Sequence, residues 1–135
     1  MIVQIYEIQT PSEADSMIAL GVDHIGSVIL SDSDWKDRSI LDTVRLTQSA
    51  GRCSSLIPLF KTFEIPDMLI KFLEYYRPEI VHLCDSLTNT TGIRQACRKM
   101  VALQTTIKKE LPQISIMRSI PIAPSGFTHK VPSIE

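Results

Sequence analysis

The sequence predicts an α/β fold of about five parallel strands that alternate with four helices. Residues 3–8 (VQIYEI) alternate apolar and polar side chains, which predicts a half-buried strand. Thr10 then stands as an N-cap, with Glu13 completing a capping box, and Gly21 is placed to end the helix. Residues 22–30 (VDHIGSVIL) predict the next strand. The first thirty residues therefore form one complete strand–helix–strand unit.

The rest of the chain repeats this unit. Pro58 falls inside the third expected strand, where it cannot donate to a ladder, and it predicts a bulge or incomplete pairing with the neighbouring strand. From Pro121 the pattern is lost in a Pro-rich stretch. We therefore expect one domain over residues 1–120 and an irregular tail over 121–135. The further helices are expected at about 39–50, from 66 to 77, and from the loop at 86–92 to about 110. The further strands are expected at 54–60, 80–84 and 114–120.

Two architectures fit this alternation. One is a partial (β/α)8 barrel of the TIM type, and the alternative is a flavodoxin-like doubly wound sheet. Central strands of a doubly wound sheet are covered on both faces and should be almost entirely apolar. Here polar residues recur on alternate strand positions, namely Tyr6, His82 with Cys84, and Arg118. This pattern favours the barrel, whose strand order would be 1-2-3-4-5 rather than 2-1-3-4-5.

Composition excludes several classes of protein. The chain has 135 residues, a net charge of −1 and 44% hydrophobic residues, which is typical of one soluble domain and indicates neither nucleic-acid nor membrane binding. Apolar runs are too short to span a bilayer, and the amino terminus shows no signal-peptide pattern. Cys53, Cys84 and Cys97 are odd in number and lack metal-site spacing, so we expect no metal and a reducing, cytoplasmic setting.

Five segments resemble, in order over residues 2–122, the phosphoribosylanthranilate isomerase family. They are QIYEIQ (4–9), PSE (11–13), LGVDHIGS (20–27), VHLCD (81–85) and IMRSI (116–120). The resemblance implies a TIM barrel of tryptophan biosynthesis. The family catalyses an Amadori rearrangement, an isomerisation of the aldose–ketose type, without a metal or organic cofactor. It also implies a phosphosugar-type ligand.

The departures from the family pattern concern its chemistry. Tyr6 stands where the family has its general-base cysteine, and Glu7 replaces the glycine that follows. A tyrosine of ordinary pKa is a poor base near neutral pH. Arg38 reaches the position of the family's substrate-binding arginine only after a three-residue slip. The family's acid on strand six and its phosphate loops after strands seven and eight have no counterpart in this sequence. We therefore expect an inactive relative, a pseudoenzyme or half-barrel that binds a phosphosugar or another protein.

Three further residues at the strands allow a chemical and a structural interpretation. Cys84, at the carboxyl end of the fourth expected strand, is either a displaced nucleophile or base or a small buried hydrophobe. His82 and His24 are either proton carriers or hydrogen-bonded strand histidines. The expected site thus comprises Tyr6 and Cys84 as catalytic positions and Arg38, His82 and Arg118 as substrate-binding positions.

Three other features leave alternatives open. Arg118 either binds an anion or pairs with Glu7 or Asp85. The loop at 88–92 either cradles a phosphate or merely caps the next helix through a threonine. Trp35 either covers a pocket or partner or anchors its own loop.

Partners follow from the architecture. Five barrel strands with helices on one face leave the other face and both edge strands open. We expect a homodimer that covers this face or that pairs the edges of strands one and five across a two-fold axis. The apolar part of the face would include Val81 or Leu83, Ile116, Ile120 and the rings of Tyr6 and Phe60. The rival function, tied to the doubly wound sheet, is a small-ligand-binding or protein-interaction domain without enzymatic activity.

Overall fold

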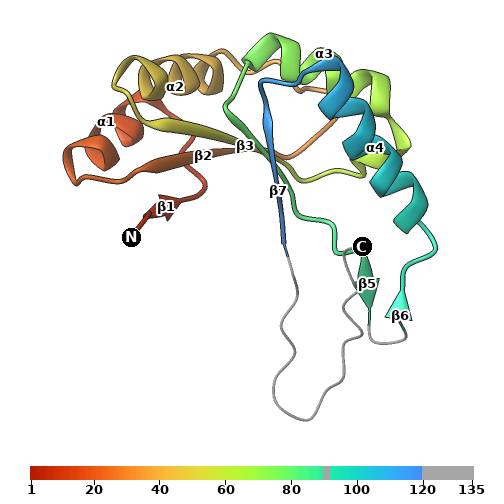
Figure 1. The fold of residues 1–135 in the computed structure, drawn as a ribbon. Helices are drawn as coiled ribbons and strands as arrows, with labels where there is room; N and C mark the ends of the chain where they lie inside the picture. The colour runs from red at the N-terminus through yellow and green to blue at the C-terminus, as the bar shows by residue number, and fades with distance from the viewer. Residues whose placement is uncertain (90–91, 120–135) are drawn as a thin grey trace.

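The fold was obtained as a computed structural model, which describes residues 1–89 and 92–119 (Figure 1). The predicted α/β class is confirmed. Five parallel strands form one sheet: β1 (Gln4–Ile5), β2 (His24–Ile29), β3 (Cys53–Pro58), β4 (Ile80–Leu83) and β7 (Ser115–Arg118). Four helices connect them: α1 (Pro11–Ala19), α2 (Arg38–Ser49), α3 (Pro66–Tyr76) and α4 (Cys97–Glu110). The remaining elements are the 3-10 turn η1 (Thr62–Glu64) and the antiparallel pair β5 (Thr88–Asn89) and β6 (Gly92–Ile93).

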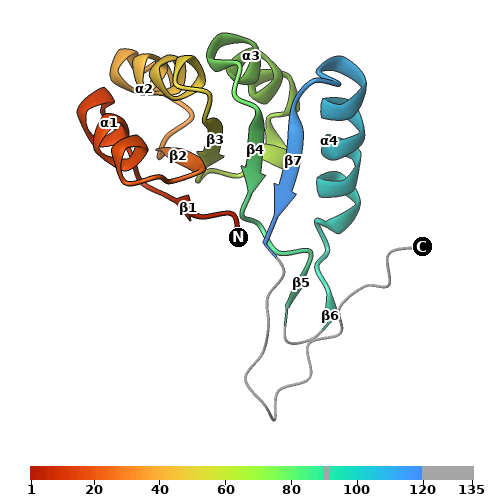
Figure 2. The ribbon, with the colours of Figure 1, turned by 60° about the vertical axis from the view of Figure 1, so that its left-hand side comes forward.

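The strands lie side by side in sequence order, β1-β2-β3-β4-β7, and every neighbouring pair is parallel. A flavodoxin-like sheet would place the second strand outside the first. The observed order is the one we expect of the partial barrel. β1 and β7 are the two edge strands, and the arrowheads of β4 and β7 point to the end of the sheet where β5 and β6 lie (Figure 2).

The hydrophobic core lies between one face of the sheet and the helices. Apolar residues of α2, α3 and α4 form one cluster with Ile29, Leu56, Val81 and Leu83 of the strands. A smaller cluster joins Ala14 of α1 to the first two strands. We call this side the helix face and the opposite side the inner face. Side chains alternate along a strand, so the strand residues directly before and after these core residues point to the inner face.

Local signals fixed several element ends as expected. Thr10 and Glu13 form both halves of the capping box, and Gly21 has a φ of 84°. Pro58 lies at the end of β3, and the pairing of β3 with β4 stops two residues earlier, at Leu56. Leu59 N–H bonds to β2, so the nitrogen of residue 58 faces β4. Because the pairing of β3 with β4 has already ended, no backbone N–H is needed at residue 58, where proline has none.

Two expected elements differ from the structure. The first strand pairs only over Gln4–Ile5 because Glu7 adopts a left-handed φ of 62°, which ends the extended backbone. The last helix does not start directly after the 86–92 loop but at Cys97, with Ala96 as N-cap. The β5–β6 hairpin occupies the intervening chain. The threonine cap expected at this helix is therefore not formed. The phosphate cradle expected of residues 88–92 includes residues 90 and 91, which lie outside the described residues. The tail expected over 121–135 lies outside the described residues.

Of the apolar residues expected on the inner face, Tyr6 lies there, Phe60 packs against the helix-face core, and Ile120 is outside the described residues. Val81, Leu83 and Ile116 belong to the helix-face core rather than to the inner face. Large exposed apolar side chains instead gather at the edge strand, where Met1, Ile2, Val3 and Tyr6 are 111%, 70%, 38% and 41% exposed. These four side chains form an exposed apolar surface along this edge of the sheet.

Candidate functional site

The inner face carries a cluster of aromatic and polar side chains from strands at both ends of the sheet. Tyr6, which follows β1, reaches across to β7, where its hydroxyl donates a hydrogen bond to the Met117 sulfur at 3.7 Å. Its ring lies against the ring of His82 on β4, with centroids 5.4 Å apart. The ring also lies over Gly26 of β2, where a Cβ would be only 2.9 Å from the Tyr6 Cδ1. The glycine thus leaves the space that the tyrosine occupies.

Burial keeps the Tyr6 phenol in its neutral form. Partial desolvation raises the pKa of Tyr6 above its ordinary value of 10, and the nearby Cys84 adds to this shift. A phenol with a raised pKa is not ionised at neutral pH. Tyr6 can therefore donate a hydrogen bond but does not supply a phenolate base.

His82 is buried, with 9% of its surface exposed. Its Nε2 lies 3.1 Å from the Ser119 hydroxyl. Its buried Nδ1 has no hydrogen-bond partner within the described part of the chain. Burial lowers the pKa of His82, so the ring is neutral at pH 7. A neutral imidazole with one free nitrogen can bind a ligand donor or acceptor.

Cys84 follows β4 directly and lines a cavity of about 220 Å³ at the carboxyl ends of β3 and β4. Burial raises the pKa of the thiol and the Asp85 charge adds to the shift, while a hydrogen bond with Ser119 opposes it. The thiol is therefore protonated at neutral pH and is a weak nucleophile. The other residues around this cavity are Pro58, Leu59, Phe60 and Lys61.

Four buried polar atoms lack a hydrogen-bond partner within residues 1–89 and 92–119, and all belong to inner-face positions. They are Gln4 Nε2, His24 Nδ1, Ser55 Oγ and His82 Nδ1. Ser55 is completely buried and pairs in register with Gly26, whose missing side chain faces Tyr6. Buried polar groups are nearly always hydrogen-bonded in folded proteins. These four atoms therefore leave hydrogen-bonding capacity on the inner face that no group in the described residues uses.

The two arginines expected at the site lie elsewhere. Arg38 begins α2, and its Nε bonds to Asp42 one turn along at 2.9 Å, with 75% of its side chain exposed. Arg118 points to the helix face, because it shares the strand parity of Ile116. Its Nη1 donates to the Asp85 carbonyl at 2.7 Å, and the Gln104 amide oxygen faces it in the orientation that satisfies both groups. Burial lowers the pKa of Arg118, and the Asp85 charge opposes this shift. Arg118 is therefore bonded to the backbone carbonyl of Asp85 rather than to its carboxylate.

Two other residues singled out in the sequence are also remote from the cluster. His24 is the first residue of β2, at the amino end of the sheet, whereas Cys84 lies at the carboxyl end. Trp35 packs on Phe72 and Tyr75 of α3, with ring centroids 5.8 and 5.5 Å away. Its carbonyl accepts a hydrogen bond of 2.5 Å from the Tyr76 hydroxyl. Trp35 is thus an anchor of its loop on the core.

A second cavity at the same end of the sheet was not predicted. It measures about 410 Å³ and lies between η1 and the start of α4. Three cationic side chains and one carboxylate, that of Glu64, line this cavity. Lys61 lines both this cavity and the one beside Cys84. The cationic side chains are Lys61, Arg94 and Lys99. They are scattered in sequence, so only the folding of η1 against α4 brings them together.

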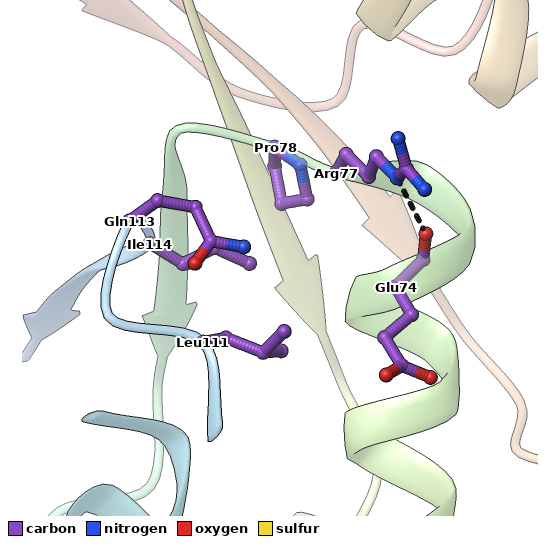
Figure 3. Close-up of a pocket in the computed structure, with 6 residues that line it drawn as sticks. All are labelled: Glu74, Arg77, Pro78, Leu111, Gln113 and Ile114. Atoms are coloured by element: carbon purple, nitrogen blue, oxygen red, sulfur yellow. Dashed lines mark hydrogen bonds between the residues drawn. The ribbon is translucent and has the colours of Figure 1, made fainter. Parts of the chain in front are cut away.

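A third cavity, of about 570 Å³, opens at the other end of the sheet (Figure 3). It lies between the carboxyl end of α3 and the segment that joins α4 to β7. Arg77, which ends α3 with a left-handed φ of 51°, donates from Nε to the Glu74 carbonyl at 3.2 Å. None of the inner-face cluster lines this cavity. We therefore place the candidate site at the carboxyl ends of β3 and β4.

No model of a known protein family matches this chain, and no curated protein sequence matches it either. Within the described ranges, no helix is both long and apolar enough to cross a membrane.

Proposed function

We propose that this chain is a partial barrel of the phosphoribosylanthranilate isomerase type that binds a phosphosugar-like molecule without isomerising it. The ligand lies at the carboxyl ends of β3 and β4, beside the inner-face cluster. The sequential strand order supports the barrel relationship, because each strand–helix unit adds its strand next to the previous one, as in a TIM barrel.

The state of Tyr6 is the observation that carries the proposed loss of catalysis. Tyr6 occupies the position of the family's general base, and its phenol is neutral and hydrogen-bonded to Met117. Its ring fills the space over Gly26. The neighbouring thiol of Cys84 is protonated as well, because its pKa is raised. Neither group supplies an anionic base for proton abstraction at neutral pH.

The free hydrogen-bonding capacity of the inner face supports binding of a polyhydroxylated molecule. His82 Nδ1 and Ser55 Oγ each accept or donate according to tautomer or rotamer, and both lack partners in the part of the chain that the structure describes. Sugar hydroxyls have the same dual capacity. Because both atoms are buried, a sugar would satisfy them where it enters the space beside them or through a bridging water, which a purely apolar ligand would not do.

An assay of isomerisation of phosphoribosylanthranilate by the full 135-residue chain tests the proposed loss of catalysis. We expect no turnover by the wild type or by Tyr6→Cys, because the family's acid on strand six has no counterpart in this sequence. Turnover by the wild type that Tyr6→Phe abolishes would contradict the proposal. Turnover by Tyr6→Cys alone would show that the tyrosine is the sole obstacle.

We also propose a homodimer formed through the edge strand β1. The N–H and C=O groups of Val3 both bond to the β2 side, so those of Ile2 and Gln4 point to the open edge. Ile2 is 70% exposed there. Antiparallel pairing of two such edges across a two-fold axis covers both the backbone groups and the apolar side chains.

Light scattering after size exclusion at micromolar concentration tests the dimer. We expect wild type to run as a dimer and Ile2→Lys to run as a monomer. Leu20→Lys is the matched control, because Leu20 is 77% exposed but lies at the end of α1. A monomeric wild type, or equal dissociation by both variants, contradicts the edge interface.

A cytoplasmic setting belongs to the same proposal. Cys53, Cys84 and Cys97 are all free thiols in this structure. Free, partly buried cysteines are typical of proteins from a reducing compartment.

A further inference from the structure

We propose that Lys61, Arg94 and Lys99 form a binding site for the phosphate group of a phosphorylated sugar. The inference rests on the proposed function, since it assigns one part of the same ligand. The family's own phosphate loops follow strands seven and eight, so this site is a different one.

The charges around the cavity favour an anion. Three cationic side chains and one carboxylate line it, which leaves an excess of two positive charges. Glu64 engages one of the cations, Lys61, at 3.6 Å. The whole chain carries a net charge of −1, so this excess is a local feature rather than a reflection of composition. Converging cations at a hollow raise the local concentration of anions.

Arg94 is held in place by the backbone around it. The guanidinium Nη1 donates to the Ser86 carbonyl at 3.2 Å, and the backbone N–H of Arg94 donates to the Leu87 carbonyl at 2.9 Å. The guanidinium retains donors for a ligand, because a guanidinium has five N–H groups. An arginine that is already oriented loses less entropy on binding phosphate.

The position of Lys61 connects this cavity with the one beside Cys84. Lys61 lines both the cationic cavity and the cavity beside Cys84. Pro58 and Phe60 also line the cavity beside Cys84. A ligand whose phosphate lies among the cations can therefore extend its carbon chain past Lys61 toward Cys84. Asp85 also lines the cavity beside Cys84, where its carboxylate suits hydroxyl groups and disfavours a second anionic group. The arrangement thus selects a monophosphate of a polyol or sugar.

Isothermal titration of the full chain with ribose 5-phosphate, ribose and inorganic phosphate tests the site. We expect ribose 5-phosphate to bind, and inorganic phosphate to bind more weakly and to compete with it. Lys99→Gln and Lys61→Gln should each weaken ribose 5-phosphate binding about tenfold, because each removes one charged hydrogen bond. The matched control is Lys108→Gln, at the other end of α4 and exposed, which should bind as the wild type does.

The outcomes separate this inference from the proposed function. Equal binding of ribose and ribose 5-phosphate would overturn the phosphate site but leave ligand binding at the strand ends intact. Equal weakening by Lys99→Gln and Lys108→Gln would also overturn it, since only overall charge would then matter. Binding of none of the three compounds would contradict both proposals. The exposed positions of the lysines keep the variants folded, which circular dichroism verifies.

Discussion

The Tyr6 hydroxyl donates a hydrogen bond to the Met117 sulfur at 3.7 Å and so joins the two edges of the five-stranded sheet. The two residues are 111 positions apart, and neither strand pairs with the other. The Tyr6 side chain therefore covers part of the inner face between the two edge strands.

Loss of this hydrogen bond should change stability little. We expect Tyr6→Phe to lower the free energy of unfolding by about 0.5 kcal/mol or less, because a thioether is a weak acceptor. Tyr6→Ala should cost about 1–2 kcal/mol, since it also removes the half-buried ring from His82 and Gly26. Urea denaturation measures both values. Equal losses in the two variants would mean that the hydroxyl, not the ring, holds the inner face.

Gly26→Ala should destabilise the fold by about 1–3 kcal/mol through overpacking. A Cβ at residue 26 would lie 2.9 Å from the Tyr6 ring, 3.1 Å from Ile57 Cδ1 and 3.3 Å from the Ile5 carbonyl. In the double variant with Tyr6→Ala, part of this loss should disappear, because one of the crowded groups is removed. Strict additivity of the two variants in denaturant titrations would contradict the packing of Tyr6 on Gly26.

The pH dependence of stability should carry a contribution from His82. Burial lowers its folded-state pKa below the ordinary value of 6.5, so the unfolded state binds more protons between these two pKa values. This contribution is complete above about pH 6.5 and is lost as the pH falls through the window below it. His82→Gln should flatten the decline, measured as the difference in unfolding free energy between pH 7.5 and 5. A steeper decline in the variant would oppose the assigned direction.

Arg77→Gly should stabilise the protein by about 0.5–1 kcal/mol. Arg77 ends α3 with φ 51° and ψ 52°, a conformation that costs a residue with a Cβ more than it costs glycine. The loss of its hydrogen bond to the exposed Glu74 carbonyl offsets only part of this gain. Thermal unfolding measures the change. Gly51→Ala is the mirror control and should be destabilising, because residue 51 has a φ of 69° at the end of α2.

Sequence periodicity predicted most of the fold because each element had a local signal. The capping box at Thr10 and the glycine at residue 21 marked α1 without help from the rest of the chain. The early end of β1 had no such signal, since Glu7 adopts a positive φ that its residue type does not indicate. The late start of α4 was missed because no local signal in the polar loop indicates that β5 pairs with β6 before the helix begins.

The candidate site was predictable only in part. Tyr6, His82 and Cys84 were found because they recur at alternate strand positions, and the structure brings them together at one end of the inner face. Arg118 lies on the helix face, which its parity with Ile116 in β7 already indicates. Lys61 and Lys99 carried no signal at all, because their convergence depends on how η1 packs against α4.

Binding without turnover is tested most directly by ¹H–¹⁵N correlation spectra of the chain, recorded as phosphoribosylanthranilate is added. We expect shifts at Lys61, Cys84, Asp85 and Arg94, saturation with added ligand, and no signals of the rearranged product. Shifts confined to residues around the cavity of Figure 3, such as Glu74 and Gln113, would contradict the proposed location of the site. Appearance of product, or a spectrum that does not change, would contradict the claim of binding without turnover.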